Sequence, residues 1–212
     1  MEQASAAVAG KASDIDTGAH EYVDLGLPSG TLWATCNVGA SNPDDYGDYF
    51  AWGEYVPKSD YSWTTYKWCN GSLNYLTKYN NARKYGKVDN RIVLNLEDDA
   101  AVVNWGGLWR MPTFAEWAEL REKCTWTWTS QNGHKGYKVV SKSNGNYIFL
   151  PAAGYRNGMS LYHEGMYGYY WCQSLTESGP YKAWILYFSS GFVYSDNSDR
   201  CYGRPVRPVC RP

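Results

Sequence analysis

The sequence predicts a single α+β domain made of short antiparallel strands, one or two main helices and long irregular loops. From Tyr22 onward, short apolar runs are separated by Gly, Asn, Asp and Pro, a texture typical of strands joined by turns. Spacing with a helical period occurs in few places, which favours the α+β class. The length of 212 residues fits one large domain. Residues 1–21 are expected to be a linker or a cloning remnant, and residues 22–212 the folded domain.

The first expected elements are a strand and a loop. Residues 31–38 (TLWATCNV) follow a Pro-Ser-Gly turn and read as a strand. Residues 42–53 (NPDDYGDYFAWG) read as a loop with an aromatic strand in its second half. The apolar residues of 73–85 fit neither the helical nor the strand period, so the structure of that stretch stays open.

The strongest helix prediction is the stretch TFAEWAELREKC at residues 113–124. Thr113 and Glu116 form a capping box, in which each side chain accepts a hydrogen bond from a backbone N–H of the other residue. Trp117 and Leu120 then fall on one face of the helix. We therefore expect an amphipathic helix with a buried stripe.

The remaining elements are a shorter helix followed by two groups of strands. Acidic residues open the stretch 97–104 (EDDAAVVN), where they favour the positive end of a helix dipole. Asn-Gly pairs then favour tight hairpins in an antiparallel meander of three strands. The strands expected after the helices begin around Trp126 and Trp128 and continue at residues 136–142, 147–153, 169–175, 183–189, 192–195 and 205–210. Two prolines confine the last of these strands to positions that tolerate a missing N–H.

Composition excludes several classes of function. The 20 basic and 21 acidic residues nearly cancel, so nucleic-acid binding by bulk electrostatics is disfavoured. No apolar run approaches the ~20 residues that a membrane span requires. Residues 1–20 lack the basic start and apolar core of a signal peptide. The 6 cysteines have no Cys-x-x-Cys spacing, which argues against a zinc ribbon or a thioredoxin site, whereas disulfides and buried thiols both stay open.

No nucleotide-binding, zinc-protease or serine-hydrolase motif is present in the sequence. The histidines fall in an expected linker, turn and loop and are interpreted as surface residues: His20, His134 and His163. Asp44, Asp45 and Asp48 could bind calcium through carboxylate oxygens, but the EF-hand spacing is missing. These acids are therefore interpreted as turn formers.

Residues 162–202 are crowded with Tyr, Ser, Asp and Asn between the expected strands. Tyrosine gives a large contact area with few torsions to immobilise, and Ser and Asn give adaptable hydrogen bonds; binding loops of immunoglobulins use the same mixture. This composition favours a recognition surface. The alternative, half-buried strand tyrosines between ordinary turns, stays open on composition alone.

Five strings in the chain carry a resemblance to a known family. They are YVDLGLPSGTLWATCNVGA (22–40), GDYFAWGE (47–54), NWGGLWRMPTFAEWAEL (104–120), IFLPAAGYR (148–156) and GRPVRPV (203–209). Together they resemble the Fibrobacter succinogenes major paralogous domain family of gut-type bacteria. That family is similar in turn to the formylglycine-generating-enzyme branch of the C-type lectin-like fold.

The resemblance implies a compact C-type lectin-like domain in which the strands at 31–38 and 205–210 pair. Variable proteins of diversity-generating retroelements also look like this, with mutable codons in their last strands and loops. Here that zone is residues 162–202. Mutation of adenines in Asn codons tends to yield Asn, Tyr, Ser, Asp and His, and these residue types are well represented there.

The chain departs from the family pattern at several positions. Cys172 and Gln173 stand where small hydroxyl residues are usual, and Cys201 departs from the usual ending, which suggests diversified sites. The Glu-Pro-Asn, Gln-Pro-Asp and Trp-Asn-Asp triplets of calcium-dependent lectins are missing, so calcium-mediated sugar binding is not expected. Cys201 and Cys210 are nine positions apart, unlike the closely spaced copper-binding pair of formylglycine-generating enzymes.

We expect a non-enzymatic ligand-recognition domain, a receptor-binding or adhesin module that is the variable protein of a diversity-generating retroelement. The expected partner is a protein or a surface glycan, with no cofactor, metal, nucleic acid or transmembrane segment. The expected location is the cell surface, the extracellular space or a virion, within a larger assembly. The expected ligand-binding residues are Tyr162, Tyr167, Gln173, Leu175, Tyr187, Ser189, Tyr194, Asp196, Asn197 and Tyr202. The tryptophans expected to be buried as the frame are Trp33, Trp109, Trp117 and Trp171.

Two alternative functions stay open. One is a formylglycine-generating-type oxidase or a degenerate relative, which would use Cys201 with Cys172 or Cys210. The other is a structural module of a surface or phage-tail protein.

Overall fold

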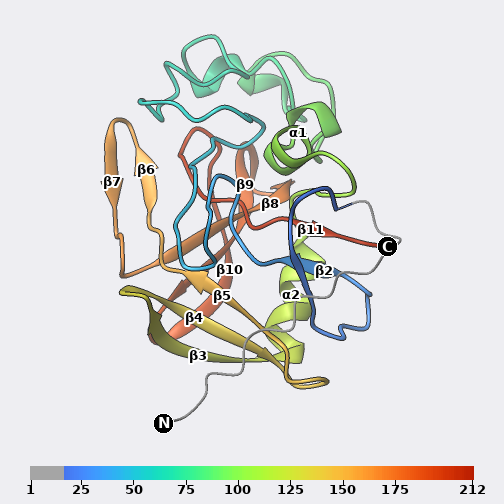
Figure 1. The fold of residues 1–212 in the computed structure, drawn as a ribbon. Helices are drawn as coiled ribbons and strands as arrows, with labels where there is room; N and C mark the ends of the chain where they lie inside the picture. Colours follow the sequence, from blue (N-terminus) through green and yellow to red (C-terminus); the bar gives the residue numbers. More distant parts are fainter. Residues whose placement is uncertain (1–16) are drawn as a thin grey trace.

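The computed structural model describes residues 17–212 and shows an α+β fold of small antiparallel sheets with two α-helices (Figure 1). The α+β prediction is confirmed. Residues 1–16 of the expected linker lie outside the described residues. The end of that stretch contacts the domain, because the backbone oxygen of Thr17 accepts a 3.0 Å hydrogen bond from Trp109 Nε1, and His20 stacks on Trp105.

One sheet joins the two ends of the domain. Strand β2 (Leu32–Ala34) pairs on one side with β1 (Tyr22–Asp24) and on the other with β11 (Val209–Cys210). The expected pairing of the strands at 31–38 and 205–210 is confirmed, although both are shorter than expected. Pro205 and Pro208 have no N–H to donate, so only isolated hydrogen bonds continue the ladder, such as the one from Val38 N to the oxygen of Val206.

The predicted meander is confirmed as the sheet β3 (Cys124–Gln131), β4 (His134–Ser141) and β5 (Tyr147–Pro151). Asn132 and Gly133 connect the first two strands with positive φ angles of 47° and 91°. These are the angles that an Asn-Gly hairpin turn needs.

The third sheet has the strand order β10 (Phe192–Asp199), β9 (Gly179–Ser189) and β8 (Gly168–Thr176). One face packs against helix α2 (Phe114–Lys123), where Tyr170 and Phe188 meet Trp117. The other face is covered over part of its length by residues 50–52, 94 and 206, which pack on Trp171 and Ile185. The sheet is therefore buried on both faces at one end only.

Shorter elements lie in the loops. The stretch left open at 73–85 contains two single 3₁₀ turns, η1 (Leu73–Tyr75) and η2 (Arg83–Tyr85). Residues 155–162 form a hairpin that was not predicted, β6 (Tyr155–Asn157) and β7 (Ser160–Tyr162), which stands at one side of the domain (Figure 1).

The expected helix at 97–104 is divided in two. A 3₁₀ turn η3 (Leu96–Asp98) is followed by helix α1 (Ala100–Trp105). Between them, Asp99 has extended backbone and its side chain accepts hydrogen bonds from Ala101 N and Val102 N. Asp99 is therefore an N-cap, and capping by an internal aspartate ends the first turn before the helix begins.

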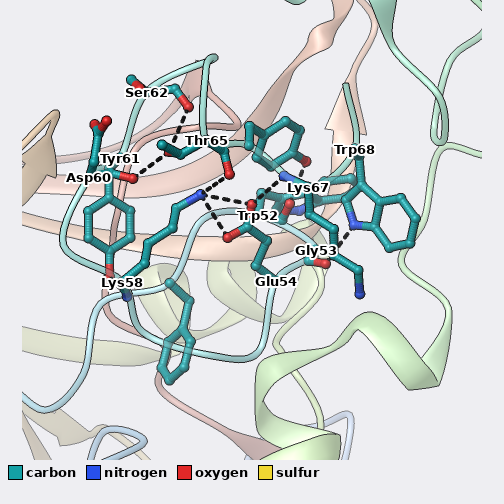
Figure 2. Close-up of polar contacts among 12 residues, drawn as sticks. Trp52, Gly53, Glu54, Lys58, Asp60, Tyr61, Ser62, Thr65, Lys67 and Trp68 are labelled. Carbon is teal, nitrogen blue, oxygen red and sulfur yellow. Dashed lines mark hydrogen bonds and ion pairs between the residues drawn. The ribbon is translucent and has the colours of Figure 1, made fainter. Parts of the chain in front are cut away.

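The long loop after residue 53 is held by polar side chains instead of regular structure, as Figure 2 shows. The buried Glu54 carboxylate accepts a 2.9 Å hydrogen bond from Lys58 Nζ and a 2.8 Å one from Lys67 N. Lys58 Nζ also donates to the oxygen of Thr65, and Trp68 Nε1 donates to the oxygen of Gly53. These bonds satisfy backbone groups that have no strand partner.

Four tryptophans are buried as predicted, with exposed fractions of at most 1%: Trp33, Trp109, Trp117 and Trp171. Trp33 and Trp117 contact each other with ring centroids 4.6 Å apart. Trp171 Nε1 donates to the oxygen of Phe50. Burial of each indole therefore joins separate segments of chain.

Arg207 is fully buried and joins three backbone segments. Its guanidinium donates to Asn37 Oδ1 at 2.9 Å, to the oxygens of Ala34 and Thr35, and to the oxygen of Phe149 at 2.9 Å. A planar guanidinium with several fixed donors can satisfy carbonyl groups that face in different directions. Arg207 therefore links the end of β2, strand β5 and the C-terminal segment.

The predicted capping box of α2 is confirmed and belongs to a buried ion-pair network. The carboxylate of Glu116 accepts hydrogen bonds from Arg110 at 2.5 and 2.8 Å, from Thr113 N at 2.9 Å, and from Thr31 Oγ1. Burial alone would raise the pKa of Glu116, but these hydrogen bonds, above all those from Arg110, lower its pKa to about 2.

Glu116→Gln should remove a pH-dependent part of the stability. A carboxyl whose folded pKa lies below its unfolded value of 4.5 stabilises the fold above pH 4.5, and this stabilisation is lost as the pH falls toward 2. Urea unfolding should show wild type losing about 2 kcal/mol more than Glu116→Gln between pH 6 and 3. Glu122→Gln, an exposed change on the same helix, is the control; equal pH profiles for wild type and Glu116→Gln would contradict the assignment.

Candidate ligand-binding surface

Aromatic rings form a continuous cluster at the end of the β8–β9–β10 sheet that other segments leave open. Neighbouring rings of the cluster have centroids 4.8–6.5 Å apart. We call this cluster the aromatic surface, and its members are Tyr155, Tyr162, His163, Tyr167, Tyr169, Tyr187, Phe192, Tyr194 and Tyr202.

Cross-strand pairing builds the centre of the aromatic surface. Tyr187 of β9 lies opposite Tyr169 of β8 on one side and Tyr194 of β10 on the other. The rings of Tyr169 and Tyr187 are stacked, with centroids 4.9 Å apart. Phe192 lies two residues before Tyr194, hence on the same face of β10, and stacks on it at 5.0 Å. The strand period of two therefore sets this row of rings.

The β6–β7 hairpin and the following turn complete the aromatic surface. Tyr155 lies between the rings of Tyr162, Tyr169 and Tyr202, at centroid distances of 5.1–5.7 Å. His163 has a positive φ of 61°, and its Nδ1 is 2.8 Å from the hydroxyl of Tyr169. A histidine in this conformation is uncommon, and here it places the ring against Tyr167 and Tyr169.

Exposure divides the rings into supporting and contacting members. Tyr169 is only 8% exposed, whereas Tyr162 is 43% and Tyr194 is 56% exposed. Asp196 is also exposed and follows Tyr194 on the same face of β10. The outer tyrosines thus present ring faces and hydroxyls to solvent on a base of packed rings.

The structure places six of the ten expected binding residues at the aromatic surface: Tyr162, Tyr167, Tyr187, Tyr194, Asp196 and Tyr202. Ser189 lies beside it at the β9–β10 turn, where its oxygen accepts a hydrogen bond from the Tyr137 hydroxyl. Gln173 is half-buried near the other end of β8, where its backbone bonds Pro112 and Leu94.

Besides Gln173, two more of the expected residues do not lie on this surface. Leu175 is only 5% exposed and packs in the core with Trp171, because residues 92–94 cover that end of the sheet and the oxygen of Ile92 accepts a hydrogen bond from Leu175 N. Asn197 follows Asp196 directly in β10, so the two side chains point to opposite faces. The structure therefore does not bring Leu175, Asn197 or Gln173 onto the aromatic surface.

Sequence reasoning missed four rings: Tyr155, His163, Tyr169 and Phe192. Tyr169 and Phe192 lie inside the Tyr-rich zone and share a strand period with Tyr187 or Tyr194, a signal that could have found them. Tyr155 and His163 reach the cluster through the β6–β7 hairpin, and the Asn157-Gly158 pair at its turn is a hairpin signal that could have found it.

A buried arginine lies beneath the aromatic surface. Arg204 is 4% exposed, and its guanidinium lies 4.6 Å from the ring centroid of Tyr169 and 5.0 Å from that of Tyr155. It donates one hydrogen bond to Ser198, while no described residue accepts a bond from Nε or Nη1. Burial lowers the pKa of Arg204 to about 10. Ring faces, and not carboxylates, therefore compensate most of this charge.

Matched substitutions of the two buried arginines should separate these environments. Arg207→Met removes the donors of several buried carbonyls and should lower the free energy of unfolding by about 3–5 kcal/mol. Arg204→Met removes a poorly compensated charge and should cost about 1 kcal/mol or less. Chemical denaturation of both variants measures the difference, and equal losses would contradict the described environments.

A hollow adjoins the aromatic surface between the β3–β4 hairpin, the turn before β8 and the β9–β10 turn. It is lined by Trp128, Lys135, Gly165, Met166, Tyr167, Ser189 and Ser190. Tyr167 belongs to both the hollow and the aromatic surface. A ligand that lies on the outer tyrosines can therefore extend into the hollow.

The cysteines do not form a site. All six thiols are free, and those proposed for oxidase chemistry are buried in different packing clusters: Cys172, Cys201 and Cys210. Burial raises the pKa of all three, for Cys210 to about 11, so each stays a protonated thiol at neutral pH. These residues do not fit the thiolate pair that copper binding would need.

The only group of three potential metal ligands among residues 17–212 is Asp44, Asp45 and His134. The buried Asp44 carboxylate already accepts hydrogen bonds from Gln131 and Asn132, and its backbone oxygen lies 2.7 Å from His134 Nδ1. These bonds explain the cluster as an anchor for the β3–β4 turn. Asp48, the third acid considered for calcium, lies outside it.

Comparison with known families finds one match, to a domain of unknown function (DUF8237), over residues 126–209. This segment runs from β3 into β11 and contains the whole aromatic surface. No curated protein and no solved structure matches the chain. No helix in the described part of the chain is long and apolar enough to cross a membrane.

Proposed function

We propose that the chain is a non-enzymatic recognition domain of C-type lectin-like fold, which binds a protein or glycan ligand through the aromatic surface. The observation that carries this proposal is the pair of exposed rings, Tyr162 and Tyr194, held on a base of packed rings at the sheet end. The joined terminal strands, the capped helix α2 and the side-chain-held loops are consistent with the proposed fold.

Packing makes the outer tyrosines suitable as binding anchors. Tyr194 stacks on Phe192, and Tyr162 stacks on Tyr155, so these rings are already ordered before a ligand arrives. Ordering side chains on binding costs free energy, and pre-ordered rings reduce that cost. Asp196 then supplies a polar group at the rim, as hot-spot surfaces usually have.

We further propose that the domain is the variable protein of a diversity-generating retroelement, displayed on a cell surface or a virion. Support comes from the position of the exposed members Tyr162, Tyr194 and Asp196, all within the Tyr-, Ser- and Asn-rich zone. The rings beneath them are half-buried, as Tyr155 and Phe192 are, or buried, as Tyr169 is, and they support the surface. Exchange of the outer side chains would therefore change the contacts without removing the core.

Tyr162→Ala and Tyr194→Ala test the proposed binding role. Because both rings are exposed, each change should alter the free energy of unfolding by less than about 1 kcal/mol. On an array of glycans and surface proteins, a ligand bound by wild type should bind the double variant at least about tenfold more weakly.

Tyr169→Ala is the structural control, because loss of its buried ring should cost about 3–5 kcal/mol. If Tyr162→Ala and Tyr194→Ala lower the melting temperature as much as Tyr169→Ala does, the outer rings belong to the core. Full ligand binding by a stable double variant would likewise refute their role as anchors.

A further inference from the structure

The hollow beside the aromatic surface combines features that suit one kind of ligand group. Its lining includes two aromatic residues, Trp128 and Tyr167, and two residues with hydroxyl groups, Ser189 and Ser190. Aromatic walls pack against the apolar C–H faces of a sugar ring, and hydroxyls exchange hydrogen bonds with sugar hydroxyls.

Lys135 gives the hollow a positive charge. Its side chain is exposed, and no carboxylate in the described part of the chain lies within ion-pair distance of its Nζ. Several other lysines are already engaged: Lys58 and Lys78 pair with acids, and Lys138 lies over the ring of Tyr147. The ammonium of Lys135 is therefore free to pair with an anion from outside the chain.

Neighbouring strands hold this geometry in place. Trp128 packs edge-on against Tyr137 at 5.2 Å and against Phe188 at 6.4 Å, so its ring is fixed by the core. The hydroxyl of Tyr137 bonds the oxygen of Ser189, which ties the β9–β10 turn to β4. Lys135 therefore lies in a hollow whose Trp128 ring is already in place before a ligand binds.

We propose that the hollow binds an acidic sugar residue, a uronic or sialic acid, of a surface glycan. The sugar ring would pack between Trp128 and Tyr167, its carboxylate would pair with Lys135, and its hydroxyls would bond Ser189 or Ser190. This inference rests on the proposed recognition function and narrows it to a glycan that continues from the hollow onto the outer tyrosines.

The test compares paired oligosaccharides that differ only in a terminal glucuronic acid or glucose, with the full chain immobilised. Wild type should prefer the acidic oligosaccharide by about fivefold, because a partly exposed ion pair contributes about 1 kcal/mol. Lys135→Gln should abolish the preference. Lys138→Gln removes the same charge from the same strand but lies on the opposite face, so it should leave the preference unchanged.

Three results would overturn the inference: no binding of either oligosaccharide, equal binding of both by wild type, or an unchanged preference in Lys135→Gln. An oligosaccharide ending in sialic acid and its neutral counterpart should be measured in parallel. The inference is overturned when the glucuronic acid pair and the sialic acid pair each give one of these three results. The proposed function is tested separately by Tyr162→Ala and Tyr194→Ala. If those variants lose a protein or neutral-glycan ligand while the acidic pairs show no preference, recognition stands and the acidic-sugar site does not.

Discussion

The guanidinium of Arg207 is the interaction on which the arrangement of this domain depends. It satisfies backbone oxygens at the end of β2 and in β5, and the side chain of Asn37, from a position in the C-terminal segment. These segments are far apart in sequence. The end of β2 and strand β5 are not hydrogen-bonded to each other in a sheet. A protein with many irregular loops must satisfy buried carbonyls by side chains, and here one side chain does so for several segments.

The same irregularity determines which part of the β8–β9–β10 sheet is accessible to solvent. Phe50, Trp52, Leu94 and Val206 cover one part of a face of the β8–β9–β10 sheet, and the aromatic surface lies on the rest. Strand pairing holds the backbone of the sheet along its length, while the side chains at one end stay accessible. Arg204 lies at the border, with its charge facing the rings of Tyr155 and Tyr169.

Elements governed by neighbouring residues could be predicted from the sequence. The capping box of α2 and the Asn132-Gly133 turn depend on a few adjacent side chains and φ angles, and both are confirmed. The expected helix is divided because Asp99 caps α1 from inside the stretch. Neighbouring Glu97 and Asp98 are also suited to a helix start, so the sequence does not show which acidic residue is the cap.

Features governed by distant chain segments could not be predicted. Leu175 shares a strand face with Trp171, and the alternating pattern cannot show whether residues 92–94 cover it. Tyr155 joins the aromatic surface only because a hairpin folds back onto β8. The composition of the Tyr-rich zone indicated the region of the aromatic surface, and the tertiary contacts determine which rings belong to it.

The terminal sheet also has a mechanical consequence. Because β1 and β11 both run antiparallel to β2, they point in the same direction on either side of it. Tension applied through Tyr22 and Cys210 would pull β1 and β11 in opposite directions along their axes. The hydrogen bonds to β2 would then be loaded together in shear instead of opening one by one, so the two ends of the domain would resist separation along the strand axes.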